Sequence, residues 1–215
     1  MDLQIKSKKR VVDHGEVFTS EREVNAMLNL IKQETDRIES RLLEPACGTG
    51  NFLVEVLHRK LNVVKARYRK SKLEYERYAI LAISSIYGID VLEDNVIYCQ
   101  KRLFNYFDEQ YTKLYGEDCS QACRNSARFI LERNILWGDA LTMKTCEKEE
   151  PIVFSEWSAV NGSMLKRRDY SLAHLLECQS MDSSDICSDL PRSAFIPKPI
   201  KEFPLMHFLR LDQNV

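Results

Sequence analysis

Three acidic residues, Glu44, Asp90 and Asp139, each stand at the end of a short apolar segment. The segments cover residues 42–44, 86–91 and 134–141, and their composition is typical of short strands of a sheet. If the strands are parallel neighbours in an α/β sheet, their carboxyl ends meet at one edge, which is where such sheets bind ligands. A carboxylate can accept two hydrogen bonds at once, so this edge could hold hydroxyl and amino groups of a ligand.

The first segment runs directly into a glycine turn, Pro45-Ala46-Cys47-Gly48-Thr49-Gly50, and then into an apolar run typical of a helix. Gly48 and Gly50 can adopt positive φ, and without side chains they let the backbone approach a ligand closely. A dinucleotide site would usually have a third glycine where Leu53 stands, so nicotinamide and flavin binding are disfavoured. No Gly-Lys-Ser/Thr follows the turn, which argues against a Walker-type phosphate loop.

The run Glu44-Pro-Ala-Cys-Gly-Thr-Gly-Asn-Phe52 resembles the first motif of S-adenosylmethionine-dependent DNA methyltransferases, in particular the adenine-N6 type of restriction-modification modification subunits. Two later segments also resemble the family: Gly88-Ile-Asp90 is similar to its second motif, and Gly138-Asp-Ala-Leu141 to the segment that reads the cofactor adenine. Upstream, Gly15-Glu-Val-Phe-Thr19 is similar to the segment that packs over the cofactor, with Ser20 in place of the usual proline. Three strand-end carboxylates in the family order carry more weight than any one of them.

The resemblance implies S-adenosylmethionine as the cofactor and assigns roles to single residues. Asp90 would bind the ribose hydroxyls, and Asp139 the exocyclic amine of the adenine. Phe18 would cover the cofactor, and Thr19 would reach its methionine end. The full set of cofactor-binding residues expected is Phe18, Thr19, Glu44, Ala46, Gly48, Gly50, Asp90 and Asp139.

The family's catalytic motif is not found. A fourth strand is expected at residues 151–154, and in adenine-N6 enzymes it ends in Asn/Asp-Pro-Pro-Tyr/Phe, which holds the target amine and stacks on a flipped base. Here the chain reads Ser155-Glu-Trp-Ser158, and the sequence contains no Pro-Pro. Glu156 could accept from an amine and Trp157 could stack on a base, but no catalytic residue is carried over and the catalytic residues are unknown.

The expected fold class is α/β: a Rossmann-like class I methyltransferase domain with a mostly parallel sheet flanked by helices, incomplete at its C-terminal end. Residues 1–40 would form an N-terminal arm and a helix that covers the cofactor, and residues 1–12 of this arm look mobile. Ser20 and Glu23 predict the capping box at the start of that helix. Its apolar face would carry Val24, Met27, Leu28 and Ile31. Residues 41–160 would form the cofactor-binding domain, with Val96, Leu103, Phe107 and Tyr111 as the buried face of a long helix. Residues 161–215 would be an irregular extension, with a basic loop or hairpin at 163–170 and a short helix at 171–177.

The 215 residues, with 44% apolar and 29% charged side chains, suffice for one globular domain. With a net charge of −1, any contact with double-stranded DNA must come from a local basic patch or a partner. Such a patch is offered by Lys65, Arg67, Arg69, Lys70 and Lys72, which are either a solvated helix face or a phosphate contact. No segment has the length and apolar character of a membrane span, and the seven cysteines predict neither a disulfide framework nor a metal site, so a cytoplasmic protein without metal is expected.

Three functions remain open from the sequence. The first is a DNA adenine methyltransferase whose target is chosen by a specificity subunit, since the chain has no room for a recognition domain. The second is a catalytically silent S-adenosylmethionine-binding subunit or truncated remnant that acts only with a catalytic partner chain. The third is a methyltransferase for protein or small molecules, which would need no basic patch.

Overall fold

The computed structural model describes residues 7–14, 16, 17, 19–176 and 198–213, and it has a mixed α/β architecture. Its first sheet has the order β1-β2-β3-β4. Strands β1 (Leu42–Glu44), β2 (Ile86–Asp90) and β3 (Ile135–Asp139) are parallel, and β4 (Lys144–Thr145) adds antiparallel to β3. The three strands predicted to end in acidic residues are therefore neighbours in one sheet, as the sequence indicated.

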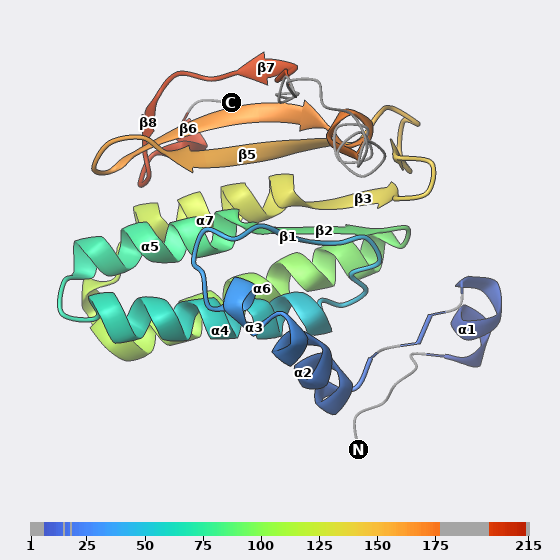
Figure 1. Cartoon of the computed structure of the whole chain (residues 1–215), viewed down its shortest axis with the longest axis horizontal. Helices are drawn as coiled ribbons and strands as arrows, with labels where there is room; N and C mark the ends of the chain where they lie inside the picture. The colour runs from blue at the N-terminus through green and yellow to red at the C-terminus, as the bar shows by residue number, and fades with distance from the viewer. Residues whose placement is uncertain (1–6, 15, 18, 177–197, 214–215) are drawn as a thin grey trace, which may run out of the picture.

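Four long helices accompany this sheet (Figure 1). Helix α4 (Asn51–Tyr68) follows β1 and α6 (Glu93–Tyr115) follows β2, whereas α5 (Lys72–Ser84) and α7 (Gln121–Asn134) run almost directly into β2 and β3. The expected apolar face of α6 is confirmed, because Val96, Leu103, Phe107 and Tyr111 are all buried. A short 3₁₀ helix, η1 (Gly116–Asp118), connects α6 to α7.

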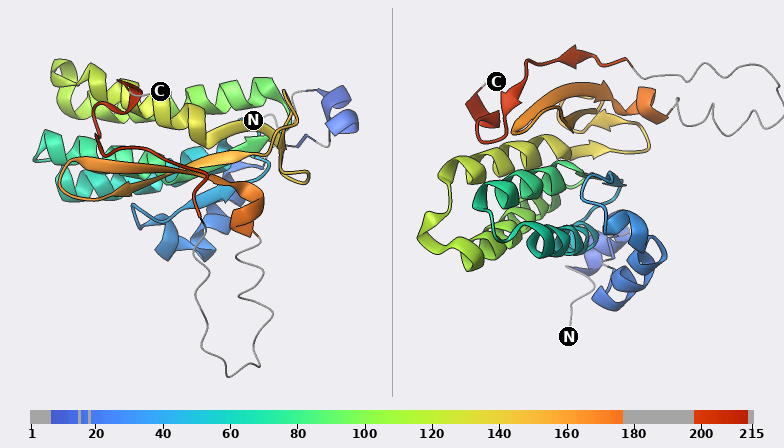
Figure 2. Two further views of the ribbon diagram at one scale, coloured as in Figure 1. Left: turned by 90° about the horizontal axis from the view of Figure 1, so that it is seen from above. Right: turned by 60° about the vertical axis from the view of Figure 1, so that its left-hand side comes forward.

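The two faces of the parallel sheet are covered differently. On the face of Ile86 and Gly88, α4 packs so closely that a Cβ on Gly88 would lie 2.9 Å from Leu53 Cδ1. The side chains of Tyr87 and Ile89 alternate to the other face and pack in a second apolar cluster with Ile152, Phe154 and Leu172. Figures 1 and 2 show the antiparallel strands on that side of the molecule.

Those antiparallel strands form a second sheet and correct two expectations. Strand β5 (Val153–Ala159) pairs with β6 (Met164–Ser171), and β6 also pairs with β7 (Lys201–Glu202) and β8 (Met206–His207); the 3₁₀ helix η2 (Leu211–Gln213) follows. The segment expected as a fourth strand of the mostly parallel sheet therefore belongs to a hairpin. The region after residue 160, expected to be an irregular extension, supplies β6, β7 and β8 to this sheet, and the segment 163–170, expected to be a basic loop or hairpin, contains most of β6. Residues 172–176 are helical, and the rest of the predicted helix lies outside the described residues.

In the described part of the chain before β1, three short helices are present: α1 (Lys8–His14), α2 (Glu21–Leu30) and α3 (Lys32–Thr35). The capping box of Ser20 and Glu23 is present at the start of α2. Only Val24 and Leu28 of the predicted apolar face are buried, whereas Met27 and Ile31 are 53% and 43% exposed. Residues 8–12, expected to be part of a mobile lead, belong to α1. No helix of the described residues is long and apolar enough to cross a membrane.

A buried lysine fixes the start of β1. Lys60 of α4 is 1% exposed, and its Nζ donates to the carbonyl oxygens of Ile38 (3.1 Å) and Ser40 and to Ser85 Oγ (2.6 Å). These acceptors belong to the segment before β1 and to the end of α5. One cation therefore ties three parts of the chain at the amino end of the sheet.

Burial lowers the pKa of Lys60 from its usual 10.5 to about 8. Between these two pH values the unfolded chain binds the proton more readily than the folded chain, so the free energy of unfolding rises with pH, by at most about 3 kcal/mol. The Lys60→Met variant lacks this rise. Urea unfolding at intervals from pH 7.5 to 10 measures it, and parallel pH profiles for the two proteins would contradict the assignment.

Candidate functional site

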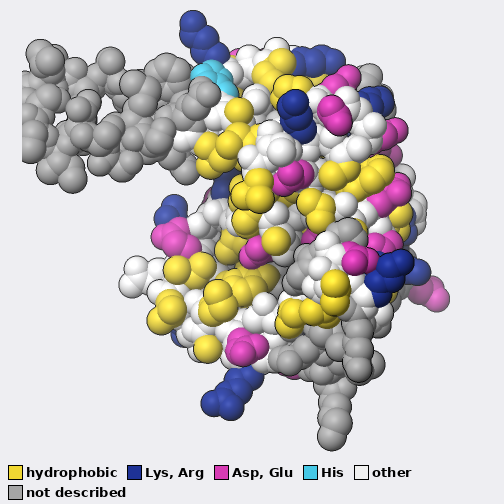
Figure 3. Space-filling view, turned by 90° about the vertical axis from the view of Figure 1, so that its right-hand side faces the viewer, with side chains coloured by type: hydrophobic (Ala, Val, Ile, Leu, Met, Phe, Trp, Pro, Cys, Tyr) yellow, Lys and Arg dark blue, Asp and Glu magenta, His cyan; other side chains and the backbone are white. Residues whose placement is uncertain are grey.

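A pocket of about 600 Å³ opens at the carboxyl ends of β1, β2 and β3. Glu44, Asp90 and Asp139, the three strand-end carboxylates, all contribute to its wall. The glycine turn, the residues that follow β2 and β3, and part of the N-terminal segment complete the lining. Figure 3 shows the molecule from this side, where hydrophobic and acidic side chains gather. The sequence-based expectation that the three carboxylates share one edge of the sheet agrees with this placement.

The three carboxylates differ in how many hydrogen bonds the protein gives them. Asp90 accepts from the backbone amides of Gly48 (2.8 Å) and Leu92 (2.9 Å) and from Asn95 Nδ2 (3.2 Å). Glu44 accepts one bond, from the Ala46 amide at 3.3 Å, and burial raises its pKa. Among the described residues, Asp139 likewise accepts one bond, from the Leu141 amide at 2.9 Å. Glu44 and Asp139 thus retain more acceptor capacity for a ligand than Asp90.

The glycine turn adopts the conformation that its glycines permit. Gly48 and Gly50 have φ values of +53° and +86°, as expected for a turn that non-glycine residues would strain. The amide of Cys47 donates to the Ile89 carbonyl (2.8 Å), and the amide of Gly50 to the Cys47 carbonyl (2.8 Å), so β2 and the turn are joined. The Gly48 amide donates to Asp90 Oδ2 (2.8 Å), so this amide is used within the protein.

Further contacts hold the turn and the N-terminal segment in place. Arg102 of α6 donates to the Thr49 carbonyl (2.8 Å) and to Asn51 Oδ1 (2.7 Å). Asn51 Nδ2 donates in turn to the Thr19 carbonyl (3.1 Å). The start of α4 has no side-chain cap, which is typical of a helix end that a ligand or water can reach.

Most of the predicted site residues meet in the pocket. Thr19, Glu44, Ala46, Gly48, Asp90 and Asp139 line it. Gly50 lies behind the wall as the N-cap of α4, where a Cβ would lie 2.6 Å from Cys99 Sγ. Phe18 lies outside the described residues.

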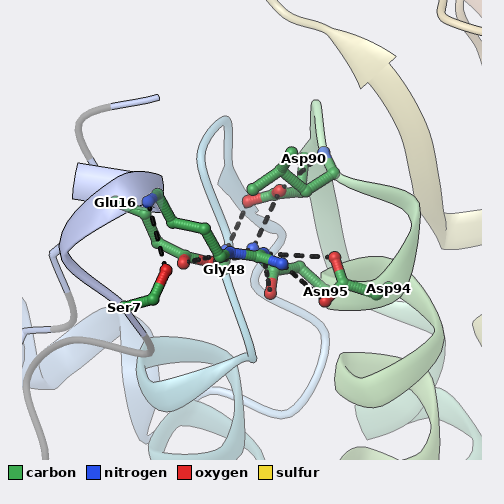
Figure 4. Close-up of polar contacts among 8 residues, drawn as sticks. Ser7, Glu16, Gly48, Asp90, Asp94 and Asn95 are labelled. Atoms are coloured by element: carbon green, nitrogen blue, oxygen red, sulfur yellow. Dashed lines mark hydrogen bonds and ion pairs between the residues drawn. The ribbon is translucent and has the colours of Figure 1, made fainter. Parts of the chain in front are cut away.

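Sequence reasoning missed Glu16, Asn95 and Arg10, which form a polar network beside Asp90 (Figure 4). Glu16 and Asn95 line the pocket, and both bind Arg10 of α1. Glu16 stands inside the segment 15–19 that was singled out for Phe18 and Thr19. Asn95 follows Asp90 by five residues, one turn into α6, so its position was a usable signal.

The two residues suggested as substitutes for the missing catalytic motif are placed elsewhere. Trp157 is 6% exposed, packs edge-on against Phe129 and donates from Nε1 to Asn134 Oδ1 (3.2 Å). Glu156 is paired with Arg41 and Arg168. Neither lines the pocket, because β5 belongs to the hairpin.

The charge of the pocket wall has one sign. Four carboxylates, those of Glu16, Glu44, Asp90 and Asp139, line it, and that of Glu16 is ion-paired with Arg10 from outside the wall. No lysine, arginine or histidine is among the described lining residues. Such a wall repels phosphate groups and attracts cationic ones. Within the described residues, no group of histidine, cysteine and acidic side chains could hold a metal ion. Comparison of the chain with protein-family models, curated proteins and solved structures gives no match.

Proposed function

We propose that the chain binds S-adenosylmethionine in the pocket at the carboxyl ends of β1–β3. The observation that carries this proposal is the acidic wall of the pocket without a basic side chain among its described residues. S-adenosylmethionine has a sulfonium and an ammonium group and no phosphate, so its charge suits this wall. Its adenosine also suits a strand-turn-helix site with strand-end carboxylates. The volume of about 600 Å³ is in the range of pockets for ligands of this size.

Each carboxylate has a role in this proposal. Glu44, with one protein hydrogen bond, accepts from a cationic amino group of the ligand. Asp90 accepts from a ribose hydroxyl, and Asp139 from the exocyclic amine of the adenine, as the family resemblance implies. Thr19 faces the methionine end from the N-terminal segment.

The reaction proposed is methyl transfer to adenine N6 in DNA, which rests on the resemblance of the sequence motifs. The amine nitrogen attacks the methyl carbon, the carbon–sulfur bond breaks with its electron pair left on sulfur to give S-adenosylhomocysteine, and the nitrogen gives its extra proton to solvent water. Sulfur is already a good leaving group here, so the protein's main task is to align nucleophile, methyl group and sulfur. A cluster of exposed basic residues at the C-terminal end of α4, the end away from the pocket, supports DNA as the substrate: Lys65, Arg67, Arg69 and Lys70.

Calorimetry with S-adenosylmethionine tests the binding proposal. We expect Glu44→Gln to lower the affinity about tenfold, because a charge-assisted hydrogen bond in a half-buried site contributes about 1.5 kcal/mol or more. Glu117→Gln, an exposed glutamate of η1 at the opposite end of α6 from the pocket, is the matched control and should leave the affinity unchanged. Absence of binding by the unmodified chain would reject the proposal.

A second candidate, a silent subunit that acts with a catalytic partner chain, is favoured by a specific feature of the sheet. Strand β1 pairs only with β2, and among the described residues no strand lies on its outer side. Open α/β sheets bind ligands where strands continue on both sides of the first strand, and here that second half is absent from the described part of the chain. Transfer of a labelled methyl group to DNA separates the candidates: binding with transfer supports the enzyme, and binding without transfer supports the subunit.

A further inference from the structure

Arg10 joins α1 to two residues of the pocket wall, Glu16 and Asn95, through one guanidinium group. Its Nη2 donates to Glu16 Oε1 (2.8 Å) and to Asn95 Oδ1 (3.2 Å), and its Nη1 to Asp94 Oδ2 (2.8 Å). Asp94 and Asn95 lie in the first turn of α6, and Glu16 follows α1. Figure 4 shows these acceptors converging between α1 and α6. Two carboxylates and an amide from separate segments therefore share one cation.

The contacts of Asn95 determine which way its side-chain amide points. Its Oδ1 accepts from Arg10, which has only donors, and its Nδ2 donates to Glu16 Oε1 (2.8 Å) and Asp90 Oδ1 (3.2 Å). A flipped amide would turn its oxygen toward two carboxylates and its NH₂ toward a guanidinium. Arg10 thus favours the single orientation in which Asn95 donates to Asp90. Asn95 is 1% exposed, so water does not readily replace these partners.

This orientation decides which oxygen of Asp90 is left for a ligand. Oδ1 accepts from the Leu92 amide and from Asn95, whereas among the described residues Oδ2 accepts only from the Gly48 amide. A carboxylate offers about four acceptor positions, two on each oxygen. The remaining position is therefore on Oδ2, on the side of the glycine turn.

We propose that Arg10 is a positioning residue for the ligand site: through Asn95 it fixes the Asp90 carboxylate so that Oδ2 is presented to a ligand hydroxyl. The identity of the ligand rests on the proposed function, whereas the relay from Arg10 to Asp90 does not. Most of the other side chains of α1 that the structure describes are exposed to solvent, and Val12 is 83% exposed. Arg10 therefore makes the main contact that the structure describes between α1 and α6. Docking of α1 and binding of ligand then favour each other, as linked equilibria must.

Hydrogen exchange in the ligand-free protein tests the relay first. In Arg10→Met, we expect the Leu92 and Gly48 amides, which both donate to Asp90, to exchange at least about fivefold faster by NMR, because Asp90 is less firmly held. The amide of Cys47, bound to the Ile89 carbonyl, should not change. Arg22→Met, an exposed arginine of α2, is the matched control. Unchanged exchange at Leu92 and Gly48 would overturn the proposal whether or not the ligand is correctly identified.

A double-mutant cycle with S-adenosylmethionine then tests the consequence for binding. Arg10→Met should lower the affinity of the otherwise unmodified protein about fivefold to tenfold, and less than about twofold in an Asp90→Asn background, because the two residues act in series. An equal loss in both backgrounds would mean that Arg10 acts only by holding α1, and would overturn the relay. No binding by the unmodified protein would reject the proposed function and leave the exchange measurement to decide on Arg10.

Discussion

Replacing Gly50 with alanine is expected to lower the free energy of unfolding by about 3 kcal/mol, the sum of two separate costs. The φ of +86° places an alanine in the left-handed region, which costs about 1 kcal/mol. The new Cβ would also lie 2.6 Å from Cys99 Sγ, on a helix that is packed into the core. Since Gly50 is the N-cap of α4, the strain falls at the turn that forms the pocket wall. Urea unfolding followed by circular dichroism measures the change.

Two further variants separate these costs. Gly162→Ala has a φ of +54° but no atom within 4 Å of the added Cβ, so it should show only the backbone cost, about 1 kcal/mol. In a Cys99→Ala background the nearest remaining contact of Cβ is Cys99 Cβ at 3.5 Å, an ordinary distance, so the effect of Gly50→Ala should fall to that of Gly162→Ala. If Gly50→Ala costs no more than Gly162→Ala in the unmodified protein, the close packing of the turn against α6 is wrong.

The parallel part of the fold was predictable because its signals are local. A β-branched or leucine-rich segment that ends in an acid predicts a strand, and helices between such segments require parallel pairing. Strands β1, β2 and β3 and the core face of α6 were found in this way. Helix α5 was not, because its first half is charged and its second half is a continuous apolar run, so it lacks a clear amphipathic stripe; eight of its residues are buried.

The pairing partner of β5 was not predictable from the sequence of β5 itself. A short apolar segment has the same sequence pattern in a parallel sheet and in a hairpin, so the pattern does not distinguish the two. Its pairing depends on the segment after residue 163, which was expected to be a basic loop or hairpin. Two basic residues of β6 pair with acids of neighbouring strands, Lys166 with Glu202 and Arg168 with Glu156. Whether the domain belongs to the Rossmann-like class I methyltransferases stays a prediction.

In the candidate site, acidic residues at strand ends were predictable and the contact of Arg10 with Asn95 was not. Glu44, Asp90 and Asp139 stand out because an acid after an apolar strand is conspicuous. Arg10 and Asn95 stand 85 positions apart in the sequence, and their hydrogen bond exists only because α1 folds back onto α6. No local sequence pattern predicts such a contact, because a single arginine in a basic N-terminal stretch is common.

The basic cluster at the far end of α4 is the feature on which DNA binding can be tested separately from cofactor binding. Lys65, Arg67, Arg69 and Lys70 are all exposed and form no ion pair within the described part of the chain. The rings of Tyr68 and Tyr78 stack beside them with centroids 3.9 Å apart. Helix α4 has 18 residues, so its last turn lies about 25 Å from the turn at its start. Lys65 and Arg67 lie in the last turn of α4, where their charges complement the negative end of the helix dipole. This role does not explain why Arg69 and Lys70, which follow the helix, are also basic.

Changing these four residues together to glutamine should weaken binding of a defined DNA duplex by tenfold or more at low salt. The magnitude of the slope of log affinity against log salt concentration should fall by about 3.6 if all four residues contact phosphates, because each phosphate contact contributes about 0.9. Fluorescence anisotropy at several salt concentrations measures both quantities.

Lys113→Gln, a lysine of α6 already paired with Glu109, is a control for the loss of a surface charge and should leave the slope unchanged. Affinity for S-adenosylmethionine should also be unchanged, since the cluster lies at the other end of α4. An unaltered slope in the fourfold variant would remove this cluster as a DNA contact, while a lost affinity for S-adenosylmethionine would show that the substitutions disturb the fold.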